Sequence, residues 1–145
     1  MDIKIRDMMQ GDEKTVLKMM REFYTSPAVY TNGSDEIFKS DIENCLSDNP
    51  YIEGYIIEDS GKIIGYAMIA KSFSTEFGKR CIWIEDLFLT DEARGCGIGK
   101  TFFDYITKKY DGAVFRLEVE AENERAVKLY ERCGFTTLPY MEMKK

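Results

Sequence analysis

Apolar residues recur at helical spacing in four parts of the chain and predict four amphipathic helices. The stripes are Val16, Met19, Met20, Phe23 and Tyr24; Phe38, Ile42, Cys45 and Leu46; Ile98, Phe102, Tyr105 and Ile106; and Ala126, Val127, Tyr130 and Cys133. We expect the first helix to begin near Asp12 and the third to run from residue 97 to about residue 110. Asn49-Pro50 ends the second helix, and Asn123 begins the fourth.

Runs rich in β-branched and aromatic residues predict strands around these helices. They cover residues 3–6, 51–59, 62–72, 81–89 and 113–119, with a short strand pair around Pro139. Ser60-Gly61 separates the second run from the third, which is typical of a hairpin. Residues 26–34 contain proline, asparagine and glycine and predict a loop. The order of these elements predicts a mixed α/β fold.

Between the run 81–89 and the third helix lies a glycine pattern, Arg94-Gly95-Cys96-Gly97-Ile98-Gly99. Glycines at this place let a ligand approach the unpaired N–H groups of the first helical turn, where the helix dipole attracts anions. Arg94 and Lys100 add positive charge nearby. The pattern therefore predicts a site for a phosphate-bearing ligand.

Spacing excludes the two commonest nucleotide-binding loops. A Walker A loop needs a glycine where Arg94 stands, and Gly95 comes one residue too late. A dinucleotide loop needs Gly-x-Gly-x-x-Gly, but the third glycine position falls on Lys100 or Phe102. What is left is Arg-x-x-Gly-x-Gly after a strand.

That pattern resembles the acyl-CoA loop of the GNAT superfamily of N-acetyltransferases. Residues 117–135 are similar to the family's second motif, with a strand, Asn123 at a helix start, Ala126 and Tyr130 within the helix, and then Gly134-Phe135. The resemblance covers nearly the whole chain and is weakest over residues 20–50. It implies one domain over residues 1–145, with a central mixed, mostly antiparallel sheet, helices on both faces, and acyl-CoA between two splayed strands that end near Leu89 and Val119.

The resemblance also implies direct transfer of an acetyl group from acetyl-CoA to an amine, without a covalent acyl-enzyme. Backbone groups at Leu87 and Leu89 would bind the pantetheine arm, and an N–H near Leu87 would stabilise the oxyanion. The residues implied in binding acetyl-CoA or CoA are Leu87, Phe88, Leu89, Arg94, Gly95, Cys96, Gly97, Ile98, Gly99, Lys100, Asn123 and Tyr130. Asn123 is also explained as a helix N-cap. Inside the loop, the Cys96 thiol would be acidified and reactive when the site is empty.

Three residues are candidates for the proton transfers of this reaction. The segment 84–89 resembles the Glu-Asp segment of polyamine-type and related small-amine members, which implies that Glu85 is the base; Asp86 is a second choice. Burial in an apolar strand would raise the pKa of Glu85 into a useful range. An ion pair on the sheet explains Glu85 equally well. Family position implies that Tyr130 protonates the CoA thiolate, although its apolar stripe also fits a core tyrosine.

The acceptor is the least defined part of the prediction. In the family's fold the first two helices and their loop form much of the acceptor wall, which here offers Phe23 together with the candidate substrate-binding residues Tyr24, Tyr30, Asp35, Glu36 and Asp86. Aromatic and acidic side chains suit a cationic amine. We therefore expect a polyamine-like or other small primary amine, while a peptide N-terminus, a lysine side chain or an aminoglycoside stays open.

Composition restricts the alternatives. The chain has no histidine, which excludes Ser-His and Cys-His nucleophiles and histidine metal sites. Its formal charge of −6 disfavours nucleic acids and anionic membranes as partners. No apolar run reaches the length of a membrane span, and the four cysteines lack metal-ligand spacing, so we expect a cytoplasmic protein with free thiols and no metal. A homodimer stays open.

Two other functions remain compatible with the sequence. One is a GNAT-fold protein that binds CoA without transferring an acetyl group. The other is a nucleotide-binding regulatory module, which the incomplete Walker spacing disfavours.

Overall fold

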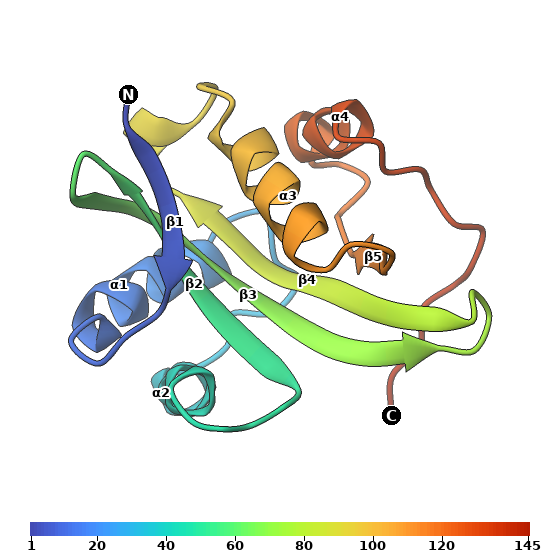
Figure 1. The fold of residues 1–145 in the computed structure, drawn as a ribbon, viewed down its shortest axis with the longest axis horizontal. Helices are drawn as coiled ribbons and strands as arrows, with labels where there is room; N and C mark the ends of the chain where they lie inside the picture. Colours follow the sequence, from blue (N-terminus) through green and yellow to red (C-terminus); the bar gives the residue numbers. More distant parts are fainter.

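A computed structural model describes residues 1–145 and contains five strands, four α-helices and one short 3-10 helix (Figure 1). In chain order the elements are β1 (Ile3–Asp7), α1 (Glu13–Tyr24), α2 (Asp35–Cys45), β2 (Ile52–Asp59), β3 (Lys62–Ser74), β4 (Lys79–Leu89), η1 (Asp91–Ala93), α3 (Ile98–Lys109), β5 (Val114–Leu117) and α4 (Glu124–Arg132). The mixed α/β architecture agrees with the prediction from the sequence.

All five strands form one sheet in the order β1-β2-β3-β4-β5. The first four are antiparallel neighbours, and only β4 and β5 run parallel. Ser60 and Gly61 both have positive φ, 51° and 86°, which is the backbone of a tight hairpin turn and confirms the predicted hairpin between β2 and β3. The parallel pair is possible because α3 crosses over between β4 and β5.

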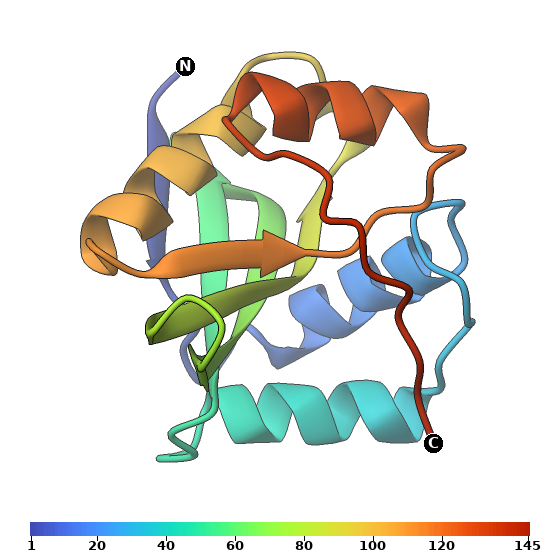
Figure 2. The same cartoon turned by 90° about the vertical axis from the view of Figure 1, so that its right-hand side faces the viewer.

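The sheet separates two pairs of helices, α1 and α2 on one face and α3 and α4 on the other (Figure 2). On one face, α3 residues such as Phe102 and Ile106 pack against the sheet, with Tyr130 of α4 at the margin. On the other face, Val16 and Met20 of α1 join residues of α2 and the sheet. The predicted apolar stripes therefore meet the two faces of one sheet, and their burial stabilises the whole arrangement.

The predicted strand pair around Pro139 is wrong. Residues 133–145 contain neither helix nor strand, and no backbone hydrogen bond involves residues 136–145. Proline has no N–H to give to a ladder, and β5 is only four residues long, so it offers little edge for pairing. The segment instead passes β5 as irregular chain (Figure 2).

None of the helices combines the length and the apolar character needed to cross a bilayer.

Candidate functional site

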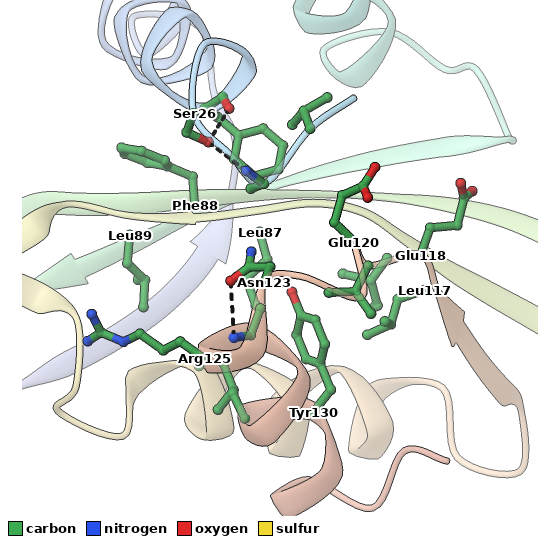
Figure 3. Close-up of a pocket in the computed structure, with 18 of the residues that line it drawn as sticks. Ser26, Leu87, Phe88, Leu89, Leu117, Glu118, Glu120, Asn123, Arg125 and Tyr130 are labelled. Atoms are coloured by element: carbon green, nitrogen blue, oxygen red, sulfur yellow. Dashed lines mark hydrogen bonds between the residues drawn. The ribbon is translucent and has the colours of Figure 1, made fainter. Parts of the chain in front are cut away.

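A deep cleft opens where β4 and β5 part. The two strands pair only from Cys81 with Val114 to Ile84 with Leu117, after which β5 ends and β4 continues to Leu89. One side of β4 is thus left without a neighbouring strand over residues 85–89. The cleft has a volume of about 1190 Å³ and is walled by β4, the glycine loop, α4, the loop after α1 and the segment after β5 (Figure 3).

A β-bulge lies at the start of this unpaired stretch. Met68 of β3 faces Asp86, whereas the next residue, Ile69, faces Ile84, so Glu85 has no partner in the ladder. The extra residue reverses the alternation of β4. Ile84 therefore packs on the α3 side, whereas Phe88 packs on the α1 and α2 side. Glu85, at the turning point, lines the cleft.

Glu85 is placed to hold or accept a proton. The walls of the cleft raise the pKa of its carboxyl by desolvation, and the negative charges of Glu142 and Asp41 raise it further. No ion pair engages Glu85, so the competing interpretation as half of a sheet ion pair has no support in the structure. The side chain stays accessible to solvent, as a base that exchanges protons must.

The glycine loop has the geometry of an anion site. Gly97 is the N-cap of α3 and has φ 79°, a left-handed conformation that favours glycine. A Cβ on Gly99 would lie 3.0 Å from Leu129 of α4, so a glycine here lets the two helices approach closely. The first N–H groups of α3 have no partners within the helix and face the end of the cleft that these glycines line.

Arg94 is fixed beside this loop rather than free. Its guanidinium pairs with Asp91 at 2.8 Å, and its Nε donates to the carbonyl of Leu89 at 3.1 Å. Lys100 pairs with Asp104 at 2.7 Å. Both residues line the cleft, whereas Cys96 is exposed and does not line it.

Arg125 also lines this end, and sequence reasoning did not single it out. From the first turn of α4 it reaches across to the loop, where its Nη2 lies 3.3 Å from the position of a Cβ on Gly95 (Figure 3). It takes part in no ion pair. The available signal was the place of Arg125 two residues after Asn123. A charged side chain on a helix surface is normally solvated, so this position alone did not distinguish Arg125 from an ordinary surface residue.

Asn123 and Tyr130 meet the cleft from α4. The Asn123 side chain accepts a hydrogen bond from the N–H of Ala126, which makes it the N-cap of the helix. The Tyr130 ring packs edge-on against Phe103 and Phe135, and its hydroxyl has no protein partner and points into the pocket (Figure 3). Burial raises the pKa of Tyr130 and keeps its phenol protonated.

The residues predicted for the acceptor end separate into two groups. Tyr24 and the exposed Tyr30 line the cleft. Asp35 and Glu36 do not; Asp35 pairs with Arg21 at 2.6 Å on the surface. Asp86 is buried behind the cleft wall and only 3% exposed.

Three further acids line the cleft that sequence reasoning did not identify: Glu118, Glu120 and Glu142. Burial raises the pKa of Glu118, and a shared hydrogen bond with Glu142 raises it further. Glu142 lies in the irregular C-terminal segment, far from the others in sequence, so no local pattern could have placed it here. The cleft thus has acids near Glu85 and cations near the glycine loop.

No group of three or more histidine, cysteine or acidic side chains is arranged to hold a metal ion, and all four cysteines are free.

Comparisons with known proteins agree with this geometry. The family model described as Acetyltransferase (GNAT) family matches residues 16–135. Thialysine N-epsilon-acetyltransferase of Sus scrofa is 27% identical over 97% of this chain and 88% of its own length. A possible acetyltransferase from Clostridium difficile 630 superposes with a TM-score of 0.83 at 21% identity, over 100% of this chain and 97% of its own. AAC(6')-Iy, solved with the bisubstrate analogue CoA-S-monomethyl-acetylneamine, gives a TM-score of 0.80 at 16% identity, over 100% of this chain and 98% of its own.

Proposed function

The chain belongs to the acetyltransferase (GNAT) family and is thus an acetyl-CoA-dependent N-acetyltransferase, and from this premise we propose that its acceptor is a small primary amine that carries positive charge. One observation carries the proposal: the same cleft holds a glycine loop with cations at one end and Glu85 among other acids at the other end. Opposite charges at the two ends suit a phosphate-rich donor and a cationic acceptor. Similar proteins include a thialysine N-epsilon-acetyltransferase and an aminoglycoside N-acetyltransferase, and both names refer to cationic amines.

The acetyl-CoA end uses mostly backbone. The diphosphate is held by the N–H groups at the start of α3, and the pantetheine arm lies along the unpaired side of β4, where its amides replace the missing strand. The Leu89 carbonyl is already engaged by Arg94, which leaves Leu87 as the better candidate for pairing with the arm. An N–H near Leu87 stabilises the thioester oxyanion, and such a donor contributes about 3 kcal/mol in acyl-transfer sites.

Protons then move between three groups. Glu85 takes one proton from the bound ammonium and passes it to water, which frees the nitrogen lone pair. The amine nitrogen attacks the thioester carbon, a C–N bond forms, and the C–S bond breaks. The phenol of Tyr130 protonates the leaving thiolate and is restored by the second proton that the nitrogen loses. The amide keeps the third proton, so one proton is released for each acetyl group transferred.

The acids at the acceptor end favour charge on the amine beyond the reacting nitrogen. The charge of Glu142 raises the pKa of Glu85, and the charges of Glu142 and Glu85 raise the pKa of Glu118, which means that these negative charges repel in the free protein. A second ammonium on the acceptor relieves this repulsion. A neutral acceptor cannot.

A panel of acceptors tests this proposal. With acetyl-CoA as donor, release of the CoA thiol should be at least about tenfold faster in kcat/KM for spermidine, thialysine or an aminoglycoside than for a peptide with a free N-terminus and no lysine. Raising the salt concentration should reduce the difference. Preference for the peptide would indicate a protein acceptor. Tight binding of acetyl-CoA without thiol release for any amine would indicate a CoA-binding protein that transfers nothing.

We expect Arg125→Gln to raise the Kd of CoA about tenfold, because a guanidinium that faces the glycine loop makes charge-assisted hydrogen bonds to a diphosphate. Calorimetric titration with CoA measures the change. Arg116→Gln is the matched control, since Arg116 stacks 4.6 Å over Trp83 and does not line the cleft. Equal Kd values for Arg125→Gln and the parent would remove Arg125 from the binding site.

A further inference from the structure

Behind the acceptor end of the cleft lies a buried carboxylate with an unusual set of partners. Asp86 has no cation nearby, and each of its oxygens accepts one phenol hydrogen bond: Oδ1 from Tyr24 at 2.9 Å and Oδ2 from Tyr66 at 2.7 Å. Tyr66 is fully buried, whereas Tyr24 lines the cleft at the end of α1. The carboxylate therefore connects the core of the sheet to the cleft wall.

The protonation state of Asp86 decides which way these hydroxyls point. Burial raises the pKa of Asp86 to about 6, even though the two phenols lower it, so the carboxyl is ionised at neutral pH. An ionised carboxylate only accepts hydrogen bonds, and each tyrosine must then donate its single hydrogen. The oxygen of Tyr24 is left with lone pairs alone.

We propose that Asp86 is a positioning residue that holds the Tyr24 hydroxyl as an acceptor, and that Tyr24 Oη receives an N–H of the amine substrate beside Glu85. The inference rests on the proposed function and names one contact that selects the acceptor. An oxygen fixed in this way attracts an ammonium group and disfavours an acceptor that presents only lone pairs. One N–H bound to Tyr24 also limits the directions in which the amine lone pair can point.

A purely structural role for the pair predicts something different. The Tyr24 ring packs against the rings of Phe38 and Phe23, with centroid distances of 5.0 Å and 5.2 Å, so its position does not depend on the hydroxyl alone. If Asp86 served only to anchor α1 to the sheet, its loss would lower stability and would impair the use of acetyl-CoA and of the amine alike. If it sets the direction of the Tyr24 hydroxyl, its loss acts on the amine and only while the hydroxyl is present.

The substitution Asp86→Asn reverses the direction of the hydrogen bond at one of the two phenols. Its amide offers one acceptor and one donor group, and the buried Tyr66 hydroxyl has no other acceptor, so the amide oxygen should stay with Tyr66. The NH₂ group then faces Tyr24, whose hydrogen turns toward the cleft, where water accepts it. An ammonium would meet a hydrogen instead of a lone pair.

The test measures amine binding and turnover in Tyr24→Phe, Asp86→Asn and the double variant. With spermidine and thialysine, Tyr24→Phe should raise the amine KM about tenfold, as expected for one lost hydrogen bond to a charged group, and Asp86→Asn should raise it more. The double variant should match Tyr24→Phe, because there is no hydroxyl left to turn. The KM of acetyl-CoA should stay unchanged in all three.

Tyr66→Phe is the control, since it removes the other hydrogen bond to the same carboxylate without touching the cleft. It should lower the thermal midpoint and leave the amine KM within about twofold. Equal effects of Asp86→Asn in the presence and absence of the Tyr24 hydroxyl would overturn the inference, as would a Tyr24→Phe variant with the parent's KM. Calorimetry with spermidine on the CoA-bound proteins separates this from the proposed function: a parent that binds and acetylates no cationic amine refutes both, whereas an active parent with unaffected variants refutes only the role of Asp86 and Tyr24.

Discussion

Replacing Glu85 with glutamine is expected to lower kcat/KM for the amine about 100- to 1,000-fold at neutral pH, the range typical of a lost general base. The physical reason is the bulge in β4, which leaves Glu85 without a ladder partner and directs it into the cleft beside the end of the unpaired stretch. Glutamine keeps the shape of the side chain but cannot accept a proton. The binding of acetyl-CoA should therefore not change.

The pH profile distinguishes a base from a substrate contact. Desolvation and neighbouring acids raise the pKa of Glu85, so the parent's kcat/KM should fall as the pH drops through a value above that of an ordinary glutamate. This acidic limb should disappear in Glu85→Gln. Glu92→Gln serves as the control, because Glu92 is 84% exposed and only loosely paired with Lys62. A Glu85→Gln variant that keeps both the parent's rate and its acidic limb would assign the proton transfer to water or another group.

The second large effect is expected for Tyr130→Phe. Removing the phenol should lower kcat about 100-fold while the KM of acetyl-CoA changes little, because protonation of the thiolate contributes to the transition state and not to binding. Since the Tyr130 hydroxyl has no protein hydrogen-bond partner, its removal leaves no unsatisfied group, and the ring keeps its contacts with Phe103 and Phe135. Thermal unfolding should therefore be nearly unchanged.

Tyr105→Phe is the matched control for that experiment. Tyr105 lies on α3 outside the cleft, packs edge-on against Tyr55 at 5.8 Å, and makes no hydrogen bond through its hydroxyl. It should keep the parent's kcat. If Tyr130→Phe also keeps it in a stopped-flow measurement of thiol release, then water protonates the thiolate and Tyr130 is a core residue that happens to border the cleft.

The glycine loop and the two helix starts at the proposed cofactor end could be predicted from sequence because they are built from local features. Gly97 marks the N-cap of α3, and Asn123 marks that of α4; each signal is contained in a few neighbouring residues. Arg125 was missed because its significance depends on the distance between two helices that are separate in sequence. Cys96, which the sequence places in the same loop, is exposed and does not line the cleft.

The acceptor end was predicted less well, for the same reason. Its acids come from β4, from the segment after β5 and from the C-terminal segment, where the sequence predicted strands around Pro139 and the structure has irregular chain. Asp35 was a candidate because it is an acid on the expected acceptor wall, but it pairs with Arg21 on the surface. Asp86 was the second choice for the base after Glu85, and the bulge sends the two side chains to different environments.

By itself, the sequence determined the mixed α/β character, the hairpin at Ser60-Gly61 and the glycine start of α3, since periodicity, turn residues and helix starts are encoded within short windows. Only the tertiary structure decided where β4 and β5 part, which acids gather at the open end and which way the Tyr24 hydroxyl faces. Those properties arise from contacts between residues far apart in the chain, such as Tyr24, Tyr66 and Asp86, whose burial and partners no local pattern contains.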